Sequence, residues 1–209
     1  ISDDRMSKPN KQLKNGVLNF FLYSYSIPFF LEMSKFSLPD KTTKIPKSTY
    51  ALLFSEVVQY CHQKVDSLDN FAKQLQLMGY PIGCTIFEVL SQSKDSQFKR
   101  ITSEIPMLIA LKEKIWHFLF GAMATDLQQQ VDDQSCYMLY DDKPMVTHYI
   151  SHPAEIKAQF SCCSFVAGII EGILFSAGFP CRITTHPNPQ SQQPNAVVYL
   201  IKFLDDQNK

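Results

Sequence analysis

The chain has 209 residues, 45% of them hydrophobic, and its twenty basic residues balance its twenty acidic residues. This length and apolar content suit one domain with one sizeable core. Because the charges cancel, no long-range field of one sign would concentrate nucleic acid, anionic lipid or acidic substrates, so these partners are not expected.

The first part of the chain differs in composition from the rest. Residues 1–47 are predicted to be an N-terminal appendage of uncertain structure, and residues 48–209 the folded domain. Within the appendage, Val17 to Leu31 is apolar and aromatic and follows three lysines, as in a signal peptide. However, this run contains polar residues, is shorter than a membrane span and has no small-residue cleavage site after it. We therefore expect a folded or partner-bound flap.

The first helix of the domain is predicted to start at Ser48, a plausible N-cap. Its core face follows helical spacing and consists of Tyr50, Leu53, Phe54, Val57 and Cys61. Leu52 falls on the opposite side and Tyr60 on the flank. This helix therefore has more apolar surface than one core contact uses, and we expect Leu52 and Tyr60 to bind a partner.

Two helices are predicted next. Ser67 caps the first, and Gly79 stands where a left-handed C-terminal residue would end it. Pro81 would occupy the first turn of the second, where its missing N–H costs nothing. The polar loop Ser91 to Lys99 would close that helix.

A fourth helix is expected from about Ile105 to Phe120, with Gly121 as its terminator. Beyond it, Cys136 to Tyr140 is rich in strand formers and precedes a turn cluster. With Met145 to Ile150 it is predicted to form a hairpin.

A fifth, buried helix is predicted to begin after Ser161 and to stop at Gly178. It carries Glu171 in the middle of an apolar run, which fits a core helix better than a membrane span. Four small residues recur at every fourth position of one face: Ser164, Gly168, Gly172 and Ser176. Two interior glycines cost roughly 1 kcal/mol each against alanine, so we expect this face to be a groove for close packing that offsets the cost.

Two C-terminal strands complete the domain. Cys181 to Thr185 and Val197 to Leu204 flank the proline-rich loop Thr185 to Asn195. The last strand is nearly continuous in apolar residues, so it should be central or covered on both faces. The predicted fold class is α+β, a single compact domain of about five helices on a mostly antiparallel four-stranded sheet.

The sequence shows no catalytic, cofactor-binding or metal-binding motif. GxSxG, GxxxxGK, GxGxxG and HExxH are all absent, and the six cysteines form no CxxC pair, which fits reduced thiols in a cytosolic protein. His148 and His152 have metal-ligand spacing only on a helix, and their neighbours favour a strand. Cys162 and Cys163 point about 100° apart on a helix and are more typical of core thiols. We therefore predict a non-enzymatic protein without cofactor or metal.

Several segments resemble a known family. LLFSEVVQYC (52–61), MGYPIG (78–83), KEKIWHFLFG (112–121) and FVAGIIEGILFSAGFPCRITTH (165–186) are similar to the small-subunit family of the transport protein particle (TRAPP) vesicle-tethering complex. These segments occur in the family's order, and the resemblance covers about residues 48 to 204.

The resemblance implies helices packed on a mostly antiparallel sheet, with the first two helices forming a surface that pairs with another family member. It also implies a structural adaptor in a complex that tethers vesicles in ER-to-Golgi and Golgi traffic and accelerates nucleotide exchange on a Rab-type GTPase. The expected partners are other TRAPP small subunits and, through the complex, the GTPase. The expected location is the cytoplasm, peripheral to Golgi and ER membranes, with membrane contact only through the complex.

One family feature finds no counterpart. A related subunit carries a fatty acyl chain on a cysteine in the loop after its third helix, but Ser91 to Lys99 contains no cysteine. An alternative function is a small-molecule or acyl-chain binding sensor domain of the same general fold. That alternative predicts an apolar cavity of at least roughly 300 Å³ among the buried helices.

Overall fold

The computed structural model describes residues 46–65, 67–92, 101–131, 133–150, 160–193 and 195–204. All of them belong to one compact unit, Thr43–Lys209. Most of the predicted appendage, including Val17 to Leu31, lies outside these residues, so its expected flap and the boundary at 47/48 stay predictions.

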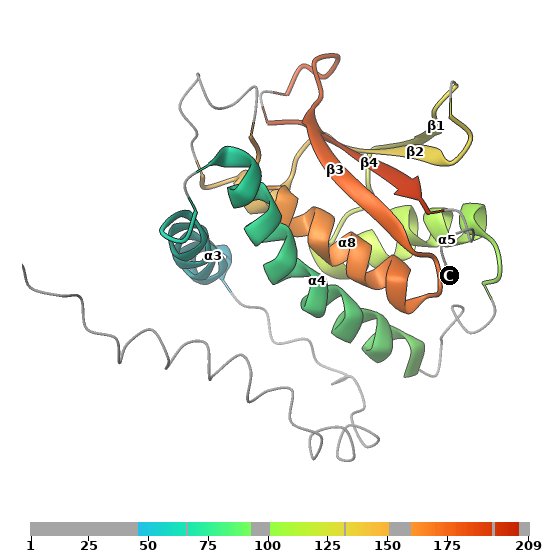
Figure 1. The fold of residues 1–209 in the computed structure, drawn as a ribbon, viewed down its shortest axis with the longest axis horizontal. Coiled ribbons are helices and arrows are strands. Elements are labelled where there is room, and N and C mark those ends of the chain that lie inside the picture. Colours follow the sequence, from blue (N-terminus) through green and yellow to red (C-terminus); the bar gives the residue numbers. More distant parts are fainter. Residues whose placement is uncertain are drawn as a thin grey trace, which may run out of the picture. The chain divides into compact units, whose positions relative to one another are not determined.

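The sheet has four antiparallel strands in the order β1-β2-β4-β3. The strands are β1 (Asp126–Gln129), β2 (Cys136–Asp141), β3 (Cys181–Pro187) and β4 (Val197–Phe203). The apolar last strand lies between β2 and β3, so the prediction that it is central is confirmed (Figure 1).

The predicted hairpin is wrong in its second strand. Met145–Thr147 forms a short 3₁₀ helix, η3, after Pro144, and the Thr147 hydroxyl donates to the Pro144 carbonyl oxygen. The sheet neighbours of β2 are β4 and the unpredicted strand β1. The segment DLQQ of β1 has few strand-forming residues, so pairing with β2 rather than intrinsic preference makes it a strand.

One long helix replaces the two that were predicted between Ser67 and Gln92. The Ser67 hydroxyl accepts from the Asn70 N–H, as expected of a cap, and α4 then runs without a break from Leu68 to Gln92 with Pro81 inside it. Gly79, predicted to end a helix, is buried against the backbone of another helix instead. The structure therefore has four helical segments of more than two turns within its described residues, one fewer than predicted.

The other helices follow the prediction closely. Helix α3 spans Lys47–His62, and its cap is Pro46 rather than Ser48. A second helical run comprises α5 (Glu104–Ala110), the π-helical turn η2 (Leu111–Ile115) and α6 (Trp116–Phe120), ending at Gly121 with a φ of 75°. The wider π turn leaves the Lys112 carbonyl oxygen to accept from the Ala124 N–H, 3.1 Å away.

Helix α8 (Ser164–Ser176) is the centre of the core. It is buried over most of its length and lies between α4 and the sheet (Figure 1). Gly178 follows it with a φ of 88°, as predicted for a helix stop. Its apolar residues face both layers, and this confirms a core helix rather than a membrane span for Phe165 to Phe179.

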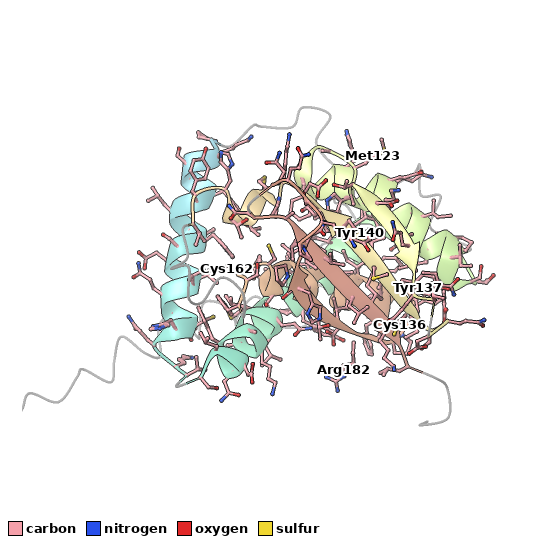
Figure 2. All side chains as sticks on the ribbon, turned by 90° about the horizontal axis from the view of Figure 1, so that it is seen from above. Met123, Cys136, Tyr137, Tyr140, Cys162 and Arg182 are labelled. Carbon is pink, nitrogen blue, oxygen red and sulfur yellow. The ribbon has the colours of Figure 1, made fainter. Side chains whose placement is uncertain are left out.

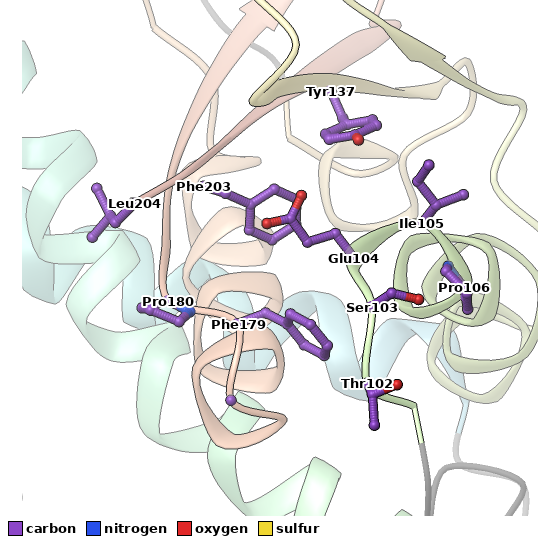
Figure 3. A pocket seen from close by; sticks show the side chains of 11 residues that line it. Thr102, Ser103, Glu104, Ile105, Pro106, Tyr137, Phe179, Pro180, Phe203 and Leu204 are labelled. Carbon is purple, nitrogen blue, oxygen red and sulfur yellow. The ribbon is translucent and has the colours of Figure 1, made fainter. Parts of the chain in front are cut away.

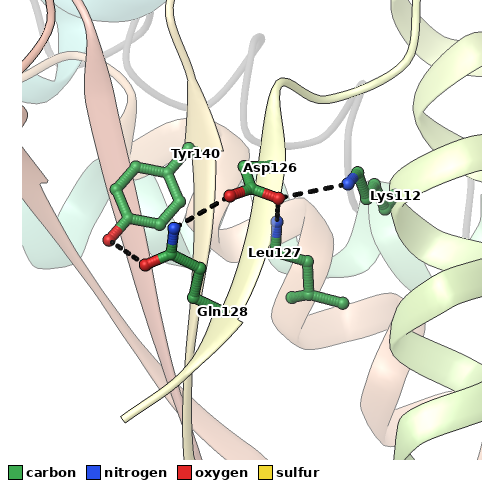
Figure 4. Close-up of polar contacts among 5 residues, drawn as sticks. All are labelled: Lys112, Asp126, Leu127, Gln128 and Tyr140. Carbon is green, nitrogen blue, oxygen red and sulfur yellow. Dashed lines mark hydrogen bonds and ion pairs between the residues drawn. The ribbon is translucent and has the colours of Figure 1, made fainter.

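Strand β1 is attached to the helical run by a small polar network (Figure 4). The Asp126 carboxylate accepts from the Gln128 side chain, from the Leu127 N–H and from the Lys112 ammonium, at 2.9, 2.8 and 3.4 Å. These contacts, with the Gln128 bond first, lower the pKa of Asp126. The short edge strand is thereby tied to η2 as well as to β2.

Candidate partner-binding surfaces

The outer face of α3 exposes two adjacent leucines. The side chain of Leu52 is 70% exposed and that of Leu53 is 65% exposed, whereas Phe54 is buried. Leu53 was predicted to face the core, and this is wrong. The core contact of α3 is narrower than expected because it consists of Phe54 and Cys61 flanked by half-buried residues.

Aromatic contacts hold α3 to the rest of the domain. The Phe54 ring lies 5.9 Å from Tyr50 and 5.2 Å from Phe165 of α8, between ring centroids. Phe54 lies about 160° around the helix from Leu52 and about 100° from Leu53, and both leucines stay uncovered by the described part of the chain.

Tyr60 lies at the edge of this face rather than fully on it. Its side chain is half-buried against the core, and the Lys64 ammonium donates to its hydroxyl while lying 4.1 Å from the ring centroid. Around the helix it lies about 80° from Leu52 and about 20° from Leu53, so its half-burial rather than its direction sets it apart from the two leucines. The α3 face, defined here as Leu52, Leu53 and Tyr60, is thus apolar in the middle with a polar, cation-bearing edge.

Two helices of the core approach each other closely enough to exclude side chains. A Cβ atom added to Gly168 would lie 2.0 Å from the Gln76 carbonyl oxygen, and one added to Gly172 would lie 2.1 Å from that of Tyr80. Gly79 and Gly83 of α4 meet backbone atoms of α8 in the same way. The glycines therefore serve contact within the domain, and they leave no groove for a partner here.

The two serines of the same stripe lie in different surroundings. Ser164 is buried, and its hydroxyl donates to the Ser161 carbonyl oxygen and pairs with Thr185 of β3. Ser176, at the other end of α8, is exposed. Only the three positions 164, 168 and 172 are therefore enclosed.

A polar hollow of about 240 Å³ opens beside the edge strand β3. There the Gln76 amide donates to the Glu171 carboxylate at 2.6 Å and to the Ile183 carbonyl oxygen at 3.0 Å. Burial raises the pKa of Glu171. Figure 2 shows Arg182 projecting outward from β3 at this side. Gln76 thus satisfies both a half-buried carboxylate and a sheet-edge carbonyl.

The buried thiols are not activated as nucleophiles. Burial raises the pKa of Cys162 to about 12 and that of Cys163 to about 11, and it also raises those of Cys61 and Cys181. Since a thiolate is the reactive form, these cysteines act as core residues. His148 follows η3 and is exposed, whereas His152 lies outside the described residues.

The sequence did not predict a polar cluster at the C-terminal end of β2, around Asp141. Burial raises the pKa of Asp141 to about 6, and close by lie Cys163 and the fully buried Tyr199. The signal was present, because Asp141 continues the inward alternation of Tyr137 and Leu139.

The described residues contain neither a candidate metal site nor a candidate membrane-spanning helix. No group of three or more histidine, cysteine or acidic side chains could hold a metal ion there. Likewise, none of the helices in that part of the chain is both long and apolar enough to span a membrane.

The family model and the similar sequences agree on one family. The family described as "Transport protein particle (TRAPP) component" matches residues 50–204. Trafficking protein particle complex subunit 5 of Dictyostelium discoideum is 37% identical over 75% of this chain and 83% of that protein. The human protein of the same name is 34% identical, covering 72% and 79%. Subunit 31 of Saccharomyces cerevisiae is 27% identical, covering 80% and 78%.

A solved structure shows the same fold. It is trafficking protein particle complex subunit 3 from Naegleria fowleri, covalently bound to palmitic acid. Its TM-score is 0.66 at 14% identity, and the match covers 76% of this chain and 95% of that one. The expectation of an α+β domain of helices on an antiparallel sheet is thereby confirmed.

Proposed function

Because this chain belongs to the TRAPP component family and is a structural subunit of that complex, we propose that it joins a neighbouring subunit through the α3 face. The observation that carries the proposal is the pair of leucines on α3 that the described part of the chain leaves exposed. A lone exposed leucine needs no explanation, but two adjacent ones beside an aromatic ring form the apolar centre that an interface requires.

The free energy available from burying the two leucines is large enough for subunit association. Fully burying a leucine side chain contributes about 1.5 to 3 kcal/mol, so Leu52 and Leu53 together could supply several kcal/mol to association. Tyr60 supplies a ring with a polar tip at the edge, which suits a rim contact. We propose another TRAPP small subunit as the partner, as the family resemblance implies.

The chain's contribution to GTPase activation would be architectural. We propose that it acts within a complex that promotes nucleotide exchange on a Rab-type GTPase, in the cytoplasm at Golgi and ER membranes. Exchange requires preferential binding of the nucleotide-free GTPase, and this is achieved by complementary surfaces rather than by an acid or base. The raised pKa values of the buried thiols support a non-catalytic role.

The alternative of an acyl-chain sensor is not favoured by the comparisons. Palmitic acid is bound covalently to the Naegleria subunit 3, which is only 14% identical to this chain. The corresponding loop of this chain, Ser91 to Lys99, contains no cysteine, and most of it lies outside the described residues. The contact between α4 and α8 also leaves no space for an acyl chain between these two helices.

Replacing Leu52 with Glu tests the pairing surface. The monomer should stay folded because Leu52 faces away from its own core, whereas assembly should weaken by several kcal/mol because a charge would be desolvated in the interface. Co-purification with TRAPP subunits and circular dichroism of the same sample measure both effects.

Met123→Glu is a matched control, since Met123 is 64% exposed and lies after α6 rather than on α3. It should assemble like the wild-type chain. Assembly of Leu52→Glu at wild-type affinity would show that the α3 face is not the interface.

A further inference from the structure

The two edges of the sheet differ in how their backbone groups are satisfied. The strand order β1-β2-β4-β3 leaves one side of β1 and one side of β3 without a neighbouring strand (Figure 1). In an antiparallel pair, the N–H and C=O groups of successive residues point alternately toward the neighbouring strand and away from it. Every second residue of each edge strand therefore offers its backbone groups to a partner outside the sheet.

The edge of β3 is closed by side chains of the two core helices. The ladder with β4 turns the backbone groups of Ile183 outward, and the Gln76 amide donates to the Ile183 carbonyl oxygen at 3.0 Å. Burial raises the pKa of Glu171, whereas hydrogen bonds from Gln76 and from the Ile183 N–H lower it. Both backbone groups at the middle of this edge are thus occupied, and Pro187 at its end has no N–H to donate.

The edge of β1 has no such closure. The Gln130 N–H donates to the Cys136 carbonyl oxygen at 2.9 Å. By alternation along the ladder, the backbone groups of Leu127 and Gln129 point away from β2. The Leu127 N–H donates to the Asp126 carboxylate, but the Gln129 N–H and the carbonyl oxygens of Leu127 and Gln129 have no partner among the described residues. Three backbone groups are therefore open on this edge.

The sequence of β1 lacks features that commonly keep an edge strand from pairing. Proteins often protect such edges with lysine, proline or an inward-pointing charge. Residues 126–130 are DLQQQ, and the charge of Asp126 is compensated by Lys112 at 3.4 Å. What remains as protection is the length of β1, four residues, which allows few hydrogen bonds to an added strand. A strand that pairs there must therefore belong to a larger protein that makes further contacts.

Exposed apolar surface lies beside this edge. Figure 3 shows Ile105 of α5 next to Tyr137, on the side away from Phe203. Tyr137 is the β2 partner of Gln129, and Phe203 belongs to β4, so Ile105 lies on the β1 side of β2. The side chain of Ile105 is 54% exposed. An added strand would direct alternate side chains toward the helical layer and cover it.

We propose that a neighbouring subunit of the complex adds an extended segment to the open edge of β1 and so continues the sheet by one strand. This inference rests on the proposed role as a structural subunit, because a chain that connects neighbours needs a second surface besides the α3 face. The open N–H and C=O groups select an extended chain, and the uncharged side chains of Leu127, Gln128 and Gln129 suit a segment that alternates apolar and uncharged polar residues.

Gln129→Pro tests the open edge, with Gln129→Ala as its matched control. Both variants lose the side-chain bonds of Gln129 to Gln134 and Tyr137, but only proline removes the outward N–H and places its ring there. Because that N–H does not pair with β2, circular dichroism should show that both variants fold. Co-purification, quantified for each TRAPP subunit, should show one subunit reduced about tenfold or more for Gln129→Pro and unchanged for Gln129→Ala. The subunit lost with Leu52→Glu should stay bound to Gln129→Pro.

Hydrogen exchange of the wild-type chain gives a second readout that needs no variant. The Gln129 N–H should exchange about tenfold slower or more in the purified complex than in the isolated chain, whereas the Gln130 N–H, already bonded to Cys136, should change little. If Gln129→Pro does not fold, this measurement decides.

Wild-type subunit composition with a folded Gln129→Pro, or unchanged exchange at Gln129, would overturn the proposal and leave that for the α3 face intact. Analytical ultracentrifugation of the isolated chain covers the remaining occupant. A dimer that Gln129→Pro abolishes would also overturn the proposal, because the added strand would then come from a second copy.

Discussion

At the scale of single residues, the structure contains a carboxylate that destabilises the fold when it is ionised. Asp141 ends β2 on its inner side, where burial raises its pKa to about 6 despite a hydrogen bond from the Lys143 N–H. Since this folded pKa lies above the ordinary value of 3.8, the unfolded chain loses the proton first as pH rises. Ionisation of Asp141 therefore leaves stability unaffected at low pH and lowers it as pH rises from about 4 to about 6.

Asp141→Asn should raise the free energy of unfolding at pH 7.5, by up to about 3 kcal/mol, because the amide needs no ionisation. At pH 4 the variant and the wild-type chain should have similar stability. Denaturant unfolding at both pH values measures this. Lower stability of the variant at both would show that the charge of Asp141 is satisfied in the fold.

A second prediction at this scale concerns the glycines of α8. Gly168→Ala should gain about 1 kcal/mol in helix propensity but lose more, since its Cβ would collide with the Gln76 carbonyl group, which cannot rotate away. We expect a net loss of roughly 1 to 3 kcal/mol in a chemical unfolding experiment. Ser176→Ala, at an exposed position of the same helix, should change stability by less than about 0.5 kcal/mol. An unchanged Gly168→Ala would mean that the helices can separate at little cost.

At the scale of elements, α4 shows how packing overrides local signals. Gly79 and Pro81 both favour a helix end, and yet α4 continues for eleven residues beyond Pro81 to Gln92. Its two glycines fit against α8, and that contact extends along both halves of the helix. A break in α4 would separate these halves and lose part of the contact with α8. The free energy of that contact therefore outweighs the destabilisation caused by an interior proline.

Pro81→Ala should accordingly stabilise the chain, by roughly 1 kcal/mol or more, because it restores an N–H to the helix interior. Pro106→Ala is the matched control. Pro106 lies in the first turn of α5, where a proline costs little, so the change should be near zero. Thermal unfolding compares the two variants. A lower melting temperature for Pro81→Ala would show instead that α4 needs the bend that proline imposes.

At the scale of the whole molecule, exposure of the α3 face links stability to assembly. A partner that binds only the folded chain stabilises it by mass action, by about 2.7 kcal/mol at a hundredfold excess over the dissociation constant. The melting temperature should therefore rise with added pairing subunit for the wild-type chain. It should not rise for Leu52→Glu at the same concentrations. A rise of equal size in both would place the contact elsewhere on the surface.

The candidate surfaces could be predicted only in part. Leu52 was found because helical spacing separates it clearly from the Phe54 stripe, and it is exposed as expected. The spacing misplaced Leu53, since the width of a core contact depends on what packs there and not on the helix alone. The hollow beside β3 could not be found, because Gln76 and Glu171 come together only through the tertiary fold.

The sequence by itself determined the features of this protein that depend on neighbours in the chain. The apolar periodicity of α5 to α6 and of α8, the glycine stops at Gly121 and Gly178, and the central apolar strand β4 all follow from local preference and burial pattern. The family resemblance rests on the same segments, because they form the core.

Only the tertiary structure decided the elements whose local preferences are weak or contradictory. Strand β1 exists because β2 offers it an edge, and Met145–Thr147 is a 3₁₀ turn because β2 already pairs with β1 and β4. Helix α4 continues through Pro81 because α8 holds both of its halves. In each case contacts between distant residues outweigh a local preference of about 1 to 3 kcal/mol. A sequence pattern reports only the local preference and not these contacts.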